Sequence, residues 1–130
     1  MTYVDGFVIP IPKKNLKAYR KLATVGAKLW SEHGCLDYKE CVAEDLDAQM
    51  FSQALPPMFP KMTRLRKGET IVFAYIVFRD RKHRDQVNAK VIKDPRMAGA
   101  ADEGMPFDVK RFAYGGFEVI VERNKRRRKS

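Results

Sequence analysis

Cysteine, histidine and long apolar runs are all scarce in this 130-residue sequence, which contains two cysteines and two histidines. The longest apolar run, Ile71 to Phe78, has the length of a strand and falls short of the roughly 18 residues that a membrane span needs. Cys35 and Cys41 belong to one expected strand, which holds them roughly 20 Å apart, too far for a disulfide. Because the start also lacks the features of a secretory signal, we expect a cytoplasmic protein.

The motifs of common enzyme classes are also absent. The sequence contains no glycine-rich phosphate loop, no Gly-x-Ser-x-Gly turn and no Cys-x-x-Cys pair. His33, Cys35 and Cys41 lack the close pairing of zinc ligands. We therefore expect neither a metal site nor a bound cofactor.

The net charge of +10 comes largely from one end of the chain. Residues 123–130 contain six of the 26 basic residues and none of the 16 acidic ones, so that residues 1–122 carry a net charge of only +4. We predict a single domain over residues 1–122 and a disordered basic tail over residues 123–130. The tail would contact nucleic acid only through nonspecific charge, and we expect no membrane partner.

Strand and helix patterns alternate along the chain. Apolar residues recur at every second position in strands and at every third or fourth position in helices. Strands are predicted at residues 3–11, 36–43, 70–78 and 110–122, and helices at residues 13–33 and 81–93.

Several local features refine these boundaries. Asp80 is suited to cap the second helix, and Asp94-Pro95 should end it. The proline-rich residues 44–68 suggest a short helix at Leu46–Leu55 and a short strand at Lys61–Leu65. Residues 95–106 are expected to form a loop. The Gly115-Gly116 pair indicates a bulge or a close approach of backbones within the last strand.

The order β-α-β-β-α-β predicts an α+β fold of ferredoxin-like topology, with a four-stranded antiparallel sheet and two helices on one face. Right-handed crossovers place strands 3–11 and 70–78 in the centre. These two strands are also apolar on both faces, as covered strands are. Since a monomer would expose a large apolar patch on the helix-free face, we predict a homodimer through that face. The alternative is that residues 44–68 or 95–106 fold over it.

Five separated stretches of the sequence are similar to one group of known proteins. They are residues 3–8, 30–34, 83–91, 105–108 and 110–118. Together they resemble the YbaA-like family, small bacterial proteins grouped under a domain of unknown function. The resemblance covers about residues 1–120 and excludes the longer 44–68 segment and the basic tail. It implies a dimeric α/β barrel, a superfamily that includes cofactor-free oxygenases, haem-degrading enzymes and ligand-binding modules, so that fold leaves function open.

These features predict a small-molecule enzyme or binding protein with a pocket between the helices and the sheet. A cofactor-free oxygenase acting on an aromatic or polyketide-like substrate is the sharpest form of this hypothesis, by analogy of fold. The alternative is a non-catalytic dimeric module that binds a metabolite or a partner. A third, weaker hypothesis is a nucleic-acid accessory protein that works through its tail.

His83 is the candidate catalytic residue, as a base or an orienting group. It lies in the first turn of the second predicted helix, where the helix dipole disfavours a protonated imidazole. Four further residues are predicted to line a ligand site with it, namely Trp30, His33, Asn88 and Arg111.

Structural interpretations of the same residues stay open. His33 would place a cation favourably at the end of a helix, and His83 could be a satisfied, partly buried group. Arg111 could form a salt bridge with Glu40 or Asp108. Asp5 lies on the strand predicted at residues 3–11, which is apolar on both faces. Its carboxylate needs a partner if it is buried, and it needs none if it lies in water at the end of the strand.

Overall fold

The computed structural model describes residues 2–101 and 104–123 of the chain. A four-stranded antiparallel sheet runs through it in the order β2-β3-β1-β4. The strands are β1 (Tyr3–Pro12), β2 (Asp37–Val42), β3 (Glu69–Phe78) and β4 (Ala113–Glu118). The predicted α+β, ferredoxin-like fold is therefore confirmed, with the two strands that are apolar on both faces in the centre.

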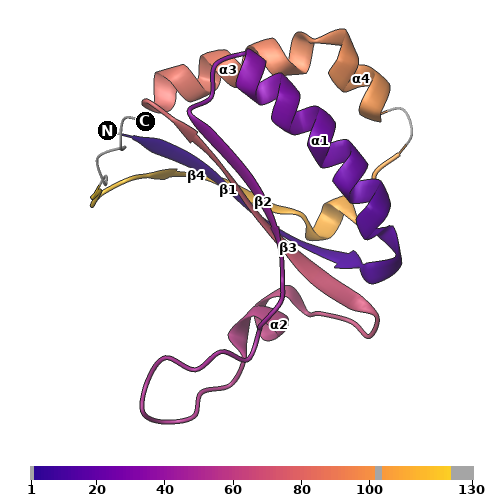
Figure 1. Cartoon of the computed structure of the whole chain (residues 1–130), viewed down its shortest axis with the longest axis vertical. Coiled ribbons are helices and arrows are strands. Elements are labelled where there is room, and N and C mark those ends of the chain that lie inside the picture. The colour runs from indigo at the N-terminus through magenta and orange to yellow at the C-terminus, as the bar shows by residue number, and fades with distance from the viewer. Residues whose placement is uncertain (1, 102–103, 124–130) are drawn as a thin grey trace, which may run out of the picture.

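The helices α1, α3 and α4 cover one face of this sheet (Figure 1). The helical elements are η1 (Lys13–Asn15), α1 (Leu16–Glu32), α2 (Met58–Thr63), α3 (Arg81–Lys93), α4 (Pro95–Ala101) and η2 (Val109–Arg111). The side chain of Asp80 caps α3 as predicted, because its Oδ1 accepts a hydrogen bond of 2.8 Å from the backbone N–H of His83.

Alternation along the central strands divides the side chains between the two faces of the sheet. Toward the helices, β1 and β3 contribute two buried clusters that enclose apolar side chains of α1 and α3. One cluster contains Ile9, Ile11, Tyr19, Ala23, Val72, Ala74 and Phe107. The other contains Leu29, Ile76, Phe78, Val87 and Val91. The opposite face, which α1, α3 and α4 do not cover, leaves Phe73 and Phe117 46% and 60% exposed.

The segment between β2 and β3 differs from the prediction. Residues 46–55 form no helix, since a short helix needs an apolar face to pack and Met50 and Phe51 are exposed. The strand expected at 61–65 is also wrong, because α2 (Met58–Thr63) occupies this part of the chain. Pro60 lies within the first turn of α2, where a proline is tolerated.

Two differences occur near the end of the domain. The loop expected at 95–106 contains α4 (Pro95–Ala101), and the last strand is shorter than predicted, because η2 (Val109–Arg111) precedes it. The paired glycines form no bulge in the register of β4 with β1. Instead a Cβ at Gly116 would lie 2.8 Å from ring atoms of Tyr3, so that a side chain, and not a backbone, approaches this glycine closely.

No helix in residues 2–101 and 104–123 is long and apolar enough to cross a membrane. The basic tail predicted at 123–130 lies outside the described residues, apart from Arg123.

Candidate functional site

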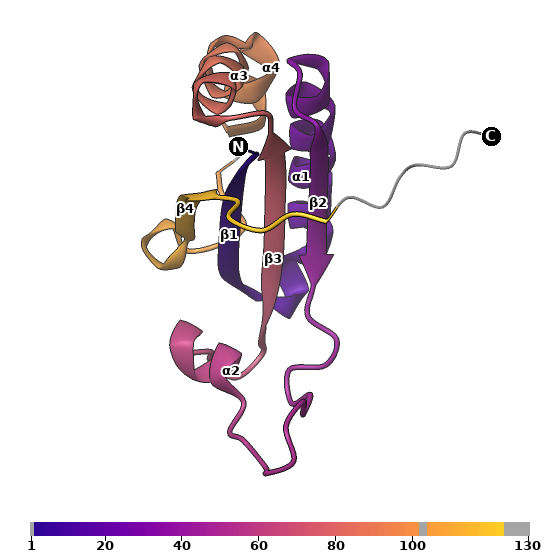
Figure 2. The same cartoon turned by 90° about the vertical axis from the view of Figure 1, so that its left-hand side faces the viewer.

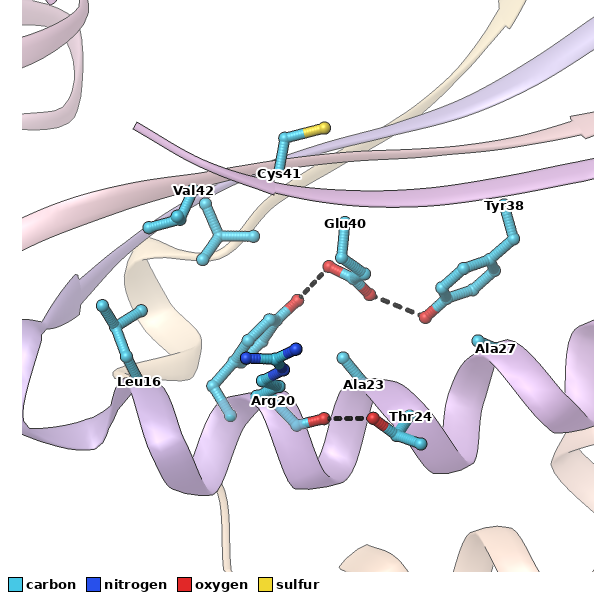
Figure 3. Close-up of a pocket in the computed structure, with 11 residues that line it drawn as sticks. Leu16, Arg20, Ala23, Thr24, Ala27, Tyr38, Glu40, Cys41 and Val42 are labelled. Carbon is cyan, nitrogen blue, oxygen red and sulfur yellow. Dashed lines mark hydrogen bonds between the residues drawn. The ribbon is translucent and has the colours of Figure 1, made fainter. Parts of the chain in front are cut away.

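A cavity of about 530 Å³ lies between α1 and the edge strand β2 (Figure 3). The helix presents small side chains to it, including Ala23 and Ala27, and the strand presents Val42. Small residues on one wall keep the helix and the strand from filling the space between them. The volume falls within the range of small-molecule sites.

The carboxylate of Glu40 is the central polar group of this cavity. Tyr19, from α1, donates its hydroxyl to Glu40 Oε1 at 2.6 Å. Tyr38 lies two residues before Glu40 on the same face of β2 and donates its hydroxyl to Oε2, also at 2.6 Å. Figure 3 shows the carboxylate of Glu40 beside the phenol ring of Tyr38, on the side of the strand that faces the helix. Each carboxylate oxygen is thus held by one donor.

Electrostatics fix the direction of both hydrogen bonds. Burial raises the pKa of Tyr19 and Tyr38 far above the ordinary value, and the hydrogen bond to Glu40 raises it further. Both phenols therefore stay protonated and donate. An ionised carboxylate has about four acceptor positions, so that Glu40 keeps lone pairs for a further donor. Within residues 2–101 and 104–123, no ion pair involves Glu40.

A second, smaller cavity of about 150 Å³ lies on the inner side of the same three residues. Tyr19, Tyr38 and Glu40 line both cavities, so that they separate the outer space at β2 from the inner space. The inner walls are almost wholly apolar and include Phe7 and Trp30. A molecule at Glu40 would therefore have its polar end at the carboxylate and an apolar body in contact with aromatic rings.

A chain of hydrogen bonds runs from the wall of the inner cavity into the sheet. Trp30 donates its indole N–H to Asn88 Oδ1 at 2.9 Å, and Asn88 donates its amide to Asp5 Oδ2 at 3.2 Å. Tyr114 donates to the same oxygen at 3.1 Å, while Arg84 Nε lies 3.6 Å from Asp5 Oδ1. Asp5 is buried and has partners, which excludes the wet strand end.

The structure brings only some of the predicted site residues together. Trp30 and Asn88 are hydrogen-bonded, and Trp30 lines the inner cavity. His33, His83 and Arg111 line neither the outer nor the inner cavity. His33 Nε2 lies 3.0 Å from Asp94 Oδ2 at the start of α4.

His83 and Arg111 are both satisfied within the fold. The imidazole of His83 is buried, its Nδ1 accepts the backbone N–H of Arg79 at 3.0 Å, and burial lowers its pKa. Arg111 binds Glu69 with both terminal nitrogens, at 2.6 and 3.0 Å. The salt bridge expected with Glu40 or Asp108 is therefore wrong, because Glu69 holds this position.

Metal ligands do not gather among the described residues: no group of three or more His, Cys, Asp or Glu side chains there could hold an ion.

Residues 2–109 match the family described as "Protein of unknown function (DUF1428)". The chain belongs to this family. The proteins named "Uncharacterized protein YbaA" from Escherichia coli K12 and Shigella flexneri are each 38% identical to it over 122 residues, covering 94% of this chain and 99% of theirs. The resemblance to YbaA-like proteins is confirmed, and none of these names states an activity.

Among solved structures, Rv0793 from Mycobacterium tuberculosis has a similar fold. Its TM-score is 0.55 at 13% sequence identity, and the match covers 95% of this chain and all of that one. At this identity the likeness concerns the fold alone, and a fold of this kind serves many functions.

Proposed function

We propose that the protein binds a small molecule that has an apolar body and a positively charged or hydrogen-bond-donating end, with Glu40 as its acceptor. One observation carries this proposal: two protonated phenols hold a carboxylate that has no cationic partner among the described residues, at the wall of a ligand-sized cavity. Glu40 is half-buried, the loss of water around a carboxylate needs compensation, and a donor on the ligand would add to it.

The arrangement favours recognition over proton abstraction. A proton taken up by Glu40 would weaken the short hydrogen bonds that both of its oxygens accept at 2.6 Å, whereas a donor on a ligand can use the remaining lone pairs. The geometry therefore supports the binding-module hypothesis better than the enzyme hypothesis.

The catalytic role of His83 stays a prediction. Its ring nitrogen Nδ1 is occupied by the backbone N–H of Arg79, and the side chain lies outside both cavities. These surroundings support the structural interpretation of this residue. Cofactor-free oxidation likewise stays a prediction, resting on analogy of fold.

Three simple aromatic probes of different charge test the proposal. Benzylamine carries a cation, benzyl alcohol a neutral donor and benzoate an anion, on nearly the same apolar body. Trp30 is the one tryptophan in the sequence and lines the inner cavity, so that its fluorescence reports occupancy. We expect benzylamine to bind most tightly and benzoate most weakly.

A matched pair of variants links this order of affinity to one carboxylate. Glu40→Gln keeps the size of the side chain and removes its charge, and we expect it to weaken benzylamine binding about tenfold or more, the loss of roughly 1.4 kcal/mol. Glu44→Gln makes the same change at an exposed position beyond β2 and should leave binding unchanged. Preferential binding of benzoate, or equal effects of the two variants, would contradict the proposal.

We further infer that two copies of the chain pair through the helix-free face of the sheet. Phe73 of β3 and Phe117 of β4 are exposed on this face, and exposed apolar patches of this kind mark protein interfaces. Phe73→Glu places a charge on this face of the sheet. We expect this variant to sediment as a monomer.

A cytoplasmic location is the remaining part of the proposal. Cys35 and Cys41 are both free thiols, which supports a reducing compartment.

A further inference from the structure

A long arm, residues 44–66, leaves the sheet after β2 and returns to it at β3. It extends well beyond the ends of the strands (Figure 2) and lies on the helix-free side of the sheet (Figure 1). The arm includes α2 (Met58–Thr63). The cavity and the two core clusters described above do not include any of its residues.

The arm is held in place by specific hydrogen bonds. At its base, the guanidinium of Arg111 binds the carbonyl oxygens of Thr63 and Arg64, both at 3.0 Å, in addition to Glu69. At its far end, the amide of Gln49 accepts the N–H of Leu55 at 2.8 Å and donates to the carbonyl of Leu55 at 3.0 Å. The arm therefore presents a defined surface.

That surface is apolar to an unusual degree for a segment in water. Met50, Phe51 and Met62 are between 67% and 88% exposed, and Met58 and Phe59 are nearly half exposed. Exposed apolar side chains in such number mark a contact surface. Since these side chains stay exposed within the subunit, a cover for them would come from another molecule.

We propose that each arm clasps a second copy of this chain. The inference rests on the pairing through the helix-free sheet face proposed above and adds the arm to it. A copy seated on that face lies on the same side as the arm. In a two-fold pair both arms then make the same contact, each with the opposite subunit.

The area available supports the clasp. At roughly 200 Å² for a large side chain, the exposed parts of Phe73 and Phe117 offer on the order of 200 Å². On the same basis, the five apolar side chains of the arm offer on the order of 600 Å². A stable interface buries about 800 Å² per partner. The two exposed sheet aromatics fall well short of this value alone, and the arm supplies the difference.

A charge placed on the arm tests the clasp in the full chain. Met62→Glu puts a charge on the apolar surface of α2, and each pair of copies contains this change twice. We expect the dissociation constant of the dimer to rise about 30-fold or more, the loss typical of an interface anchor. Gln53→Glu adds the same charge at an exposed polar position of the arm and should change it by less than about threefold. Both positions are exposed, and circular dichroism checks that the fold is kept.

Phe73→Glu distinguishes failure of the clasp from failure of the sheet pairing. If this variant is monomeric while Met62→Glu dimerises as well as the wild type, the clasp is overturned and the sheet pairing stands. A wild type that stays monomeric at micromolar concentration overturns both.

Hydrogen exchange gives a second measurement, independent of affinity. Backbone amides of residues 49–63 should exchange more slowly in the wild-type dimer than in the Phe73→Glu monomer, because the second copy covers them. Equal exchange in the two proteins overturns the clasp.

Discussion

Gly26 offers a direct test of how tightly the candidate site is built. It lies in α1, where a Cβ would stand 2.9 Å from the hydroxyl oxygen of Tyr38. In the variant Gly26→Ala, Tyr38 must therefore retreat from the helix. The hydroxyl that moves is the one that binds Glu40 at 2.6 Å, so that this hydrogen bond lengthens or breaks.

Two opposing effects set the expected magnitude. Loss of a hydrogen bond to a charged group costs about 1.5–3 kcal/mol. Replacing glycine by alanine inside a helix stabilises the helix by about 1 kcal/mol. We therefore expect Gly26→Ala to lower the free energy of unfolding by about 0.5–2 kcal/mol, and to weaken benzylamine binding as well, because Glu40 loses one of its two supports.

Gly99 is the matched control. It lies in α4, and a Cβ there would meet nothing within 4 Å. Gly99→Ala should therefore raise the free energy of unfolding by about 0.5–1 kcal/mol. Urea unfolding followed by the fluorescence of Trp30 measures both variants. If Gly26→Ala proves as stabilising as Gly99→Ala, then Tyr38 is free to move and the account of the site is refuted.

Two further predictions concern charged side chains. Burial raises the pKa of Asp5 above its ordinary value of 3.8, against the opposing effects of Asn88 and Arg84. The folded protein therefore binds a proton at Asp5 more tightly than the unfolded chain does. This proton stabilises the fold in acid, and the stabilisation is lost as the pH rises through the folded-state pKa. The stability of the wild type relative to Asp5→Asn should accordingly increase as the pH falls from neutral toward about 4, and a constant difference in urea titrations would contradict this. Arg111→Lys removes the fork that binds Glu69 and the base of the arm, so that trypsin should cleave within residues 44–66 faster than in the wild type; an unchanged rate would show that the arm is anchored elsewhere.

The sheet could be predicted because two independent signals agreed. Strands β1 and β3 are apolar on both faces, and the order of the elements puts the same two strands in the centre. Asp80, followed by a helical pattern, marked the start of α3 for a local reason, since a cap depends on only a few residues. Such short-range signals do not depend on how the rest of the chain folds.

The site could not be predicted in the same way. Tyr38 and Glu40 alternate onto one face of β2, and this was visible in the sequence. Tyr19, however, belongs to the apolar stripe of α1, and nothing in that stripe says which strand it will face. The rotation of a helix over a sheet is set by packing of the whole core, and only this rotation brings Tyr19 to Glu40.

The histidines were predicted to line the site because of the chemistry of the imidazole ring, and this chemistry does not determine where the fold places them. His83 lies on the buried side of α3 as expected, but the backbone at Arg79 already occupies one of its nitrogens. Arg111 binds Glu69 at the start of β3, a contact between residues that are distant in the sequence. Side-chain roles that depend on such long-range contacts follow from the tertiary structure and not from residue type.

The small side chains of α1 that face β2 support the proposal that the outer cavity binds a molecule. Protein interiors are filled to nearly the density of organic crystals, and larger side chains on α1 could fill the space facing β2. The helix instead places Ala23 and Ala27 there. Filling cavities commonly stabilises natural proteins, so that these small residues retain a space at some cost in stability. The cost is understandable if the space receives a molecule, with Glu40 at the point where its polar end would lie.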